Sequence, residues 1–254
     1  MKKKYMTALE AAMAFVLCCI RFAGIKEGGK EHKELIRVYN TISPLPYGYA
    51  MTTKDAWCAA FLSAIAKLLG YTKFPYECSC SRMLKKAQDM GLPTWGRGYE
   101  PKIGDGLIYD LDKNKAVDHV GIVVWVQEGK CWVVEGNYSN SVKVRCIAFD
   151  DPIIHAWICF DWMEQVDNSN FVDGDRPNIP IETPEFEEDE DMVNNEKIYN
   201  QVSEMPEWAK AEMKALEESG AMKGRGGEEG LDLTERDVRL LTIMERRIAG
   251  LARG

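Results

Sequence analysis

The hydrophobic period changes once along the first 163 residues of the chain. Before Pro93, apolar residues recur with helical spacing, and they predict helices over 6–22, 56–69 and 81–90. After Asp105, short β-branched and aromatic runs are separated by Gly, Asn, Asp and Pro, which is typical of strands. These runs are GLIYDL, HVGIVVWVQ, CWVVEGNY, SVKVRCIAF and IIHAWICF. Helices followed by an antiparallel meander predict an α+β fold rather than a doubly wound sheet.

The composition divides the chain into three parts. Residues 1–163 carry enough apolar side chains for a sizeable core and are slightly basic, which would suit an anionic target. Residues 164–195 are rich in Pro and acidic residues, carry most of the net charge of −8, and predict a solvated linker. Residues 196–254 contain EWAKAEMKALEESG, with Pro206 near its start, and LTERDVRLLTIMERR, which begins at Thr234. They predict a small two-helix module.

The N-terminus has two interpretations. MKKK followed by the apolar run 11–20 imitates a secretory signal peptide. However, Glu10 and Arg21 bracket that run, no small-residue cleavage site follows it, and it is too short to span a bilayer. We therefore expect the first amphipathic helix of the folded domain, and no membrane-spanning segment anywhere in the chain.

Cys58 stands near the start of the apolar helical run over 56–69. The segment Thr52–Asp55 matches a capping sequence, so the helix is expected to begin within about a turn of Cys58. A thiol reacts as a thiolate, which the N-terminus of a helix and a nearby base both favour. Free cysteines are also among the most buried residues. Cys58 is therefore either a buried structural residue or a nucleophile.

A base for Cys58 must come from three histidines. His32 lies in the polar run EGGKEHKEL and His155 inside an apolar strand, where a histidine is usually structural. His119 begins the strand HVGIVVWVQ directly after a polar loop, where an imidazole can be partly exposed. We therefore expect His119 to be the base.

The next strand brings two polar residues beside His119. If a three-residue loop, 127–129, joins the strands, residues 126 and 130 pair and His119 lies opposite Asn137. Because alternate residues share a face, His119, Glu135 and Asn137 then point the same way. Either Glu135 or Asn137 could then orient the imidazole, and a change of one residue in the loop would break this alignment.

Four ordered blocks of the sequence resemble a known family. DAWCAAFLSAIAKLLGY, PKIGDGLIYD, DHVGIVVWV and VVEGNYS are similar to a CHAP domain, the cysteine- and histidine-dependent amidohydrolases and peptidases, over about residues 5–162. The resemblance implies a papain-like fold with N-terminal helices packed on an antiparallel sheet. It implies Cys58 as nucleophile, His119 as base, and Glu135 and Asn137 as orienting groups. Trp57 departs from the Pro or Gln that many relatives have there, which affects the cleft entrance and the second oxyanion donor.

The resemblance also implies a function. The substrate would be bacterial peptidoglycan, and the chain a phage or prophage endolysin, most simply an N-acetylmuramoyl-L-alanine amidase. It would stay in the host cytoplasm before lysis and then act on the wall. The C-terminal part resembles a single copy of an S-layer-homology-like tail, so residues 196–254 could bind a wall polymer. The alternatives are a stem or bridge endopeptidase and a catalytically inactive wall-binding protein.

The remaining motifs are given structural interpretations. Cys78 and Cys80 lack metal-ligand spacing, as do Cys18 and Cys19, and Cys131, Cys146 and Cys159 are expected in the core. KGRGGEEG follows a helix and lacks the ending of a phosphate loop. No D-x-D-x-D run is present. We therefore expect no metal, no cofactor and no nucleic-acid partner.

Overall fold

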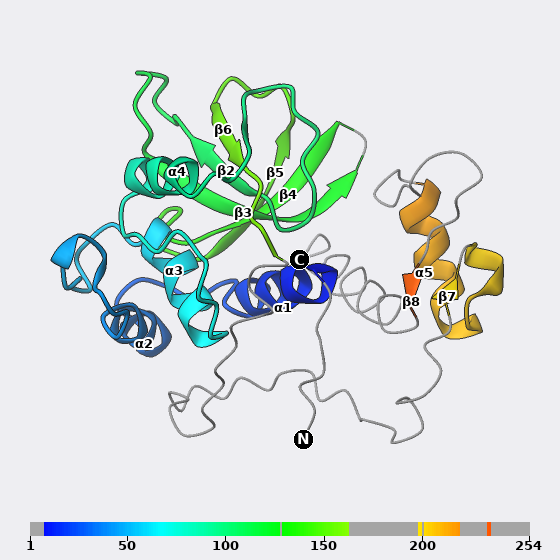
Figure 1. Cartoon of the computed structure of the whole chain (residues 1–254), viewed down its shortest axis with the longest axis horizontal. Helices are drawn as coiled ribbons and strands as arrows, with labels where there is room; N and C mark the ends of the chain where they lie inside the picture. The colour runs from blue at the N-terminus through cyan, green and yellow to red at the C-terminus, as the bar shows by residue number, and fades with distance from the viewer. Residues whose placement is uncertain (1–7, 128, 163–197, 200, 219–232, 235–254) are drawn as a thin grey trace. The chain divides into compact units, whose positions relative to one another are not determined.

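The computed structural model of the chain describes residues 8–127, 129–162, 198–199, 201–218 and 233–234 (Figure 1). The chain divides into two units, Met1–Ile179 and Pro180–Gly254, which are described separately. The expected linker over 164–195 and its two boundaries lie outside the described residues.

The first unit contains the three helices that the sequence predicts. They are α1 (Ala8–Arg21), α3 (Cys58–Leu68) and α4 (Cys80–Asp89). A further helix, α2 (Lys30–Tyr39), was not predicted, because its apolar stripe is short and the sequence before it is polar. A short 3₁₀ turn, η1 (Pro46–Gly48), lies in the segment that leads to α3. The helical part of the predicted α+β fold is therefore confirmed.

Six strands form one antiparallel sheet. They are β1 (Thr94–Trp95), β2 (Gly106–Tyr109), β3 (His119–Gln127), β4 (Lys130–Glu135), β5 (Lys143–Ala148) and β6 (Ile154–Ile158), in the order β1-β6-β2-β3-β4-β5. Strands β2 to β5 follow the predicted meander, but β6 returns to pair with β2. The expectation of a simple meander is wrong at this strand. All four residues of β2 are buried, so its backbone groups need a partner strand on both sides.

The pairing of β3 with β4 contains two deviations that cancel. Gln127 pairs with Lys130, so the loop is one residue shorter than the sequence predicted. A bulge between Val123 and Trp125 then shifts the register by one residue. Beyond the bulge Ile122 pairs with Val134, as the longer loop would also have arranged. The predicted register near the start of β3 is therefore correct, although the loop and the bulge that produce it differ from the prediction.

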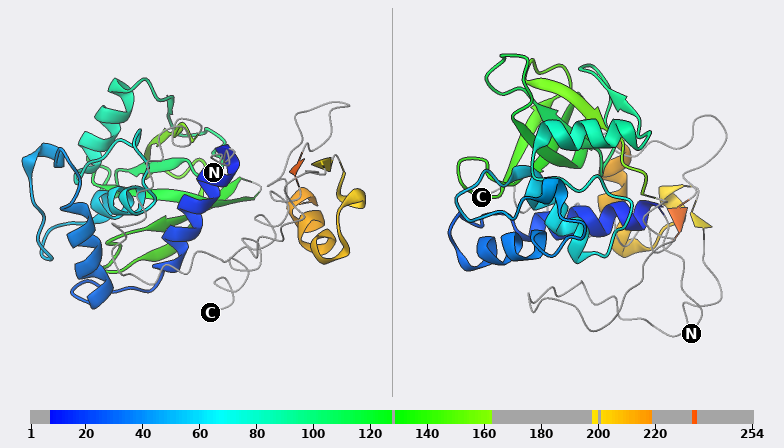
Figure 2. Two further views of the ribbon diagram at one scale, coloured as in Figure 1. Left: turned by 60° about the horizontal axis from the view of Figure 1, so that its bottom comes forward. Right: turned by 60° about the vertical axis from the view of Figure 1, so that its left-hand side comes forward.

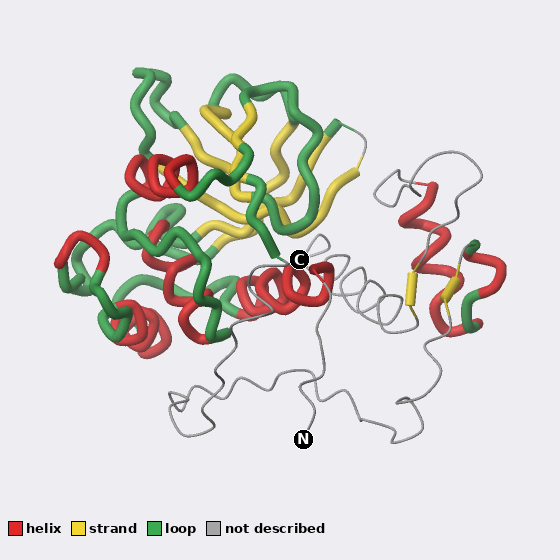
Figure 3. The backbone as a smooth tube through the Cα atoms, viewed as in Figure 1, coloured by secondary structure: helices red, strands yellow, loops and turns green. Residues whose placement is uncertain are grey.

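Helices α1 and α3 pack against β3, and α2 packs against α3 (Figures 1 and 2). In α1, Met13, Phe15 and Val16 are completely buried, which confirms a helix of the folded domain. A side chain at Gly136 would lie 2.6 Å from Cβ of Phe61, so glycine permits α3 to approach the end of β4 closely. Each large apolar side chain buried here contributes about 1.5–3 kcal/mol. Figure 3 shows that a long loop joins α3 to α4, whereas a short segment leads from α4 to β1 of the sheet.

The described residues of the second unit form short elements. Strands β7 (Ile198–Tyr199) and β8 (Leu233–Thr234) pair, and η3 (Val202–Glu204) precedes α5 (Glu207–Glu218). The helix predicted after Pro206 is confirmed, with Ala209 and Met213 buried on it and Met205 buried just before it. The helix predicted after Thr234 lies outside the described residues.

Candidate active site

The fold brings three of the four predicted site residues to one end of the sheet. Cys58 is the first residue of α3, His119 the first of β3 and Glu135 the last of β4. Because β3 and β4 are antiparallel, the start of one meets the end of the other. Helix α3 packs on β3 and brings the thiol to the same place.

The Cys58 thiol lies in a buried setting that favours its charged form. Its Sγ is 3.3 Å from Sγ of Cys80, the first residue of α4. A hydrogen bond from Cys80 lowers the pKa of Cys58 most strongly, burial opposes this, and His119 and the backbone amide of Ala59 lower the pKa further. The pKa of Cys58 is well below the usual value of 9.0 for a thiol. These contacts therefore favour the thiolate of Cys58, whereas burial by itself would favour the protonated thiol.

His119 complements the thiolate. Burial by itself lowers the pKa of His119, but the Cys58 thiolate and the Glu135 carboxylate outweigh burial and raise it. Nε2 of His119 lies 3.9 Å from Oε2 of Glu135 and has no hydrogen-bond partner. Opposite shifts of the pKa of Cys58 and His119 are those of a thiolate–imidazolium pair.

Glu135 is completely buried and held by its neighbours. Arg145 on β5 reaches both carboxylate oxygens, at 3.3 and 3.4 Å. Burial raises the pKa of Glu135, while His119, Tyr109 and Arg145 lower it. A Cβ atom at position 121 would lie 2.8 Å from Cγ of Glu135, so glycine at this position leaves room for the Glu135 side chain. Of the two predicted orienting residues, Glu135 has a carboxylate oxygen 3.9 Å from Nε2 of His119.

Asn137 follows β4 in a left-handed conformation, with φ of 61°. Its Oδ1 is buried and makes no hydrogen bond. Next to it, the ring of Tyr138 stands edge-on to His119, with 5.9 Å between ring centroids. Asn137 therefore lies one residue away from a side chain that touches His119, while its own oxygen is unpartnered.

The other two histidines lie outside this arrangement. His32 is buried on α2, accepts a hydrogen bond from the backbone of Gly28, and packs on Trp57 with 4.6 Å between ring centroids. The indole of Trp57 donates to Glu27 at 3.1 Å, so this N–H is already used and does not serve as an oxyanion donor. His155 is exposed on β6.

Three neighbours of the site were not predicted from sequence. Cys80 has a structural interpretation in the sequence analysis, but its sulfur contacts that of Cys58 from the next helix, α4. Arg145 pairs with Val133 across β4 and β5, so correct strand pairing would have placed it on the face of Glu135. Tyr109 ends β2, 5.5 Å from the His119 ring. Of the cysteines expected in the core, Cys131 is buried, but Cys146 is exposed and Cys159 is only half-buried.

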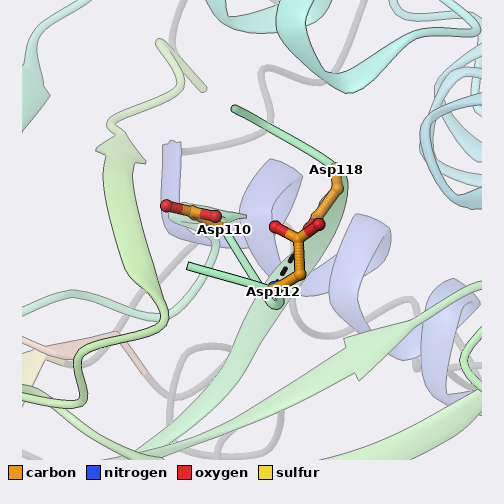
Figure 4. A group of neighbouring side chains, drawn as sticks. All are labelled: Asp110, Asp112 and Asp118. Carbon is orange, nitrogen blue, oxygen red and sulfur yellow. Dashed lines mark hydrogen bonds between the residues drawn. The ribbon is translucent and has the colours of Figure 1, made fainter. Parts of the chain in front are cut away.

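One acidic group in the described part of the chain has a spacing that could suit a cation. Asp110, Asp112 and Asp118 have carboxylate oxygens within 4.8 Å of one another (Figure 4). Asp110, Asp112 and Asn114 have a D-x-D-x-N spacing, which differs from the D-x-D-x-D run that the sequence lacks. Backbone amides of the same loop already donate to Asp110 and Asp118. Because exposed acidic groups of this kind are common without an ion, we assign no metal here.

Residues 48–137 match the family described as the CHAP domain. This segment contains Cys58, His119, Glu135 and Asn137, and the match supports a cysteine- and histidine-dependent hydrolase acting as an amidase or peptidase on peptidoglycan. No curated protein and no solved structure matches the chain. Among the described residues, every helix is too short or too polar to cross a membrane.

Proposed function

We propose that the chain is an N-acetylmuramoyl-L-alanine amidase that cleaves peptidoglycan through Cys58. The observation that carries the proposal is the placement of Cys58 at the start of α3 beside His119, with the pKa of Cys58 lowered and that of His119 raised by their contact. The CHAP match over residues 48–137 supports the same reaction class and its substrate. Cys58 is the nucleophile, His119 the acid and base, and Glu135 the group that orients His119.

The first half of the reaction forms a thioester. The Cys58 thiolate attacks the amide carbonyl carbon, and the oxygen becomes an oxyanion. The first backbone N–H groups of α3 have no partners within the helix, so they can hold this oxyanion. His119 then protonates the leaving amine. Because its Nε2 faces Glu135, Nδ1 is the nitrogen left to exchange a proton at the thiol.

The second half releases the enzyme. After the amine leaves, His119 is neutral and removes a proton from water, which attacks the thioester carbonyl. The thiolate departs and His119 is protonated again, which restores the starting pair. Glu135 remains ionised and stabilises the imidazolium at both stages.

Two other activities compete with this proposal. The same Cys–His pair would serve an endopeptidase that cuts the stem or bridge peptide, because the choice of bond depends on the surrounding loops. A catalytically inactive wall-binding protein would keep the fold, but it would have no need of the paired charges at Cys58 and His119. Of the three activities, the amidase is the one that we propose.

We further propose that the chain acts as a phage or prophage endolysin, held in the host cytoplasm until lysis. The acidic composition of residues 164–195 and the helical pattern of residues 196–254 support this organisation, in which a linker tethers a wall-binding tail to a hydrolase. Binding of the separate tail segment to intact walls would test it.

The test of the amidase is mass spectrometry of the fragments released from purified Gram-positive peptidoglycan. We expect free stem peptides with an L-alanine amino end from the native chain. Cys58→Ala should reduce this release on the order of 10⁴-fold or more, because it removes the nucleophile.

The matched control is Cys146→Ser, which changes an exposed cysteine on β5 and should leave release unchanged. New amino ends within the stem or bridge would replace the amidase by the endopeptidase. If neither the native chain nor the control releases fragments from several wall types, the chain is a binding protein instead.

A further inference from the structure

Cys80 places a second thiol against the Cys58 nucleophile, and the hydrolytic reaction has no use for it. Their sulfurs are 3.3 Å apart, both side chains are almost completely buried, and both residues are free cysteines. Hydrolysis through a thioester needs one thiol and one base. The second thiol therefore calls for a separate explanation.

The position of the two residues favours a covalent bond between them. A disulfide has a sulfur–sulfur distance of about 2.05 Å, so the two sulfurs need to approach by about 1.3 Å. Each cysteine is the first residue of its helix, α3 or α4, so its side chain is attached where regular helix structure begins. A long loop between Leu68 and Cys80 separates α3 from α4, so the two helices are not held in one continuous element. Rotation of the two side chains, with a small adjustment of α4, can close the distance.

The chemistry of the pair points in the same direction. A thiolate reacts with hydroperoxides, whereas a protonated thiol does not. Cys58 is the member of the pair that favours the thiolate. The hydrogen bond to Cys58 raises the pKa of Cys80 most, and burial and the negative charges of Cys58 and Asp118 raise it further. A reactive thiolate with a second thiol in contact is the arrangement of a peroxidatic and a resolving cysteine.

We propose that Cys58 and Cys80 are a reversible redox site, in which a hydroperoxide converts the two thiols into a disulfide. The Cys58 thiolate attacks one oxygen of hydrogen peroxide, the O–O bond breaks, and Cys58 becomes a sulfenic acid. The departing hydroxide takes a proton from His119 and leaves as one water. The Cys80 sulfur then attacks the Cys58 sulfur, the S–S bond forms, the S–O bond breaks, and the proton of Cys80 leaves with the hydroxyl as a second water. The two thiols supply two electrons and hydrogen peroxide accepts them.

The disulfide has two consequences. It removes the nucleophile, so oxidised protein cannot form the thioester; this consequence rests on the proposed function, whereas disulfide formation does not. It also prevents further oxidation of Cys58 to the sulfinic acid, which is not reversed by thiols. A dithiol restores both cysteines by exchange.

The experiment treats the full chain with a small excess of hydrogen peroxide, blocks remaining thiols by alkylation, and digests the protein with trypsin. Cys58 lies in the peptide 55–67, and Cys78 and Cys80 lie in the peptide 74–82. We expect these two peptides to be linked, with the loss of two hydrogen atoms, and dithiothreitol to reverse the link. Fragment release from peptidoglycan should fall and recover in parallel.

Two variants identify the partner of Cys58. Cys78→Ser should keep the link, because Cys80 remains, whereas Cys80→Ser should abolish it and let Cys58 gain two oxygen atoms irreversibly. The inference is overturned if native Cys58 goes directly to the sulfinic acid, or if the link persists in Cys80→Ser. A link that forms in a chain with no hydrolase activity upholds the redox site and refutes the proposed function.

Discussion

Helices α3 and α4 both begin with a cysteine, and the two sulfurs touch, yet the two thiols differ in charge. Cys58 is 5% exposed and Cys80 6%, so burial does not separate them. The pKa of Cys58 is lowered while that of Cys80 is raised. Cys58 receives hydrogen bonds from Cys80 and His119, whereas Cys80 faces the charges of Cys58 and Asp118. A helix N-terminus is common to both residues, so the partner side chains decide which thiol ionises.

The largest effect on hydrolysis is expected from His119→Ala, which removes the acid and base. Without the imidazolium, the pH midpoint for alkylation of Cys58 by iodoacetamide should also move up, because His119 lowers the pKa of Cys58. Loss of the acid and base should reduce hydrolysis by about 10²–10⁴-fold or more. The alkylation rate at Cys58 as a function of pH, read by mass spectrometry, measures the shift of the midpoint.

His155→Ala is the control for this change, because His155 is an exposed histidine on β6. It should leave both the alkylation midpoint and hydrolysis as in the native chain. An unchanged midpoint in His119→Ala would mean that the imidazole does not hold the thiolate.

A medium effect is expected from Cys80→Ala, which changes the ionisation of Cys58 but keeps the nucleophile and the base. Cys80→Ala removes the hydrogen bond that lowers the pKa of Cys58 most. A hydrogen bond to a charged group is worth about 1.5–3 kcal/mol, so the alkylation midpoint of Cys58 should rise by about 1–2 pH units. Cys80→Ser keeps a donor and should raise the midpoint less than Cys80→Ala. Equal midpoints in the two variants would show that hydrogen bonding from this position is irrelevant.

The smallest effect is expected from Glu135→Gln, which tests the support of His119. The carboxylate raises the pKa of His119, so a neutral amide lets that pKa fall. The imidazolium is then lost at a lower pH, and the alkaline limb of the pH–rate profile should move down by about one unit or less. Glu34→Gln, at a half-buried position on α2, is the control. An alkaline limb that stays in place or moves up would remove Glu135 from its orienting role.

Much of the fold was accessible from the pattern of the sequence. The helices α1, α3 and α4 and strands β2 to β6 were each predicted close to their observed bounds, because their apolar periods are long and uninterrupted. Helix α2 was missed, since a short apolar stripe in a polar run gives a weak signal. The return of β6 to β2 was also missed, because strand order depends on contacts between distant segments.

The candidate site was accessible from sequence only in part. The alternation of β3 and β4 put His119 and Glu135 on one face, although the predicted loop was one residue too long and an unforeseen bulge compensated. Asn137 belonged to the same prediction, and the structure instead leaves its Oδ1 unpartnered. Local periodicity thus finds residues on a shared face, but it does not decide which of them touches another.

The sequence by itself was enough to predict Cys58 as the nucleophile and His119 as the base, because a cysteine at a helix start and a histidine at a strand start are local features. Only the tertiary structure decided the environment of that nucleophile. The contact between Cys58 and Cys80 joins residues 22 positions apart through the packing of separate elements, and Arg145 reaches Glu135 across a strand pair. Ionisation depends on charges and hydrogen bonds within a few ångströms, and those distances are set by packing rather than by neighbours in the chain.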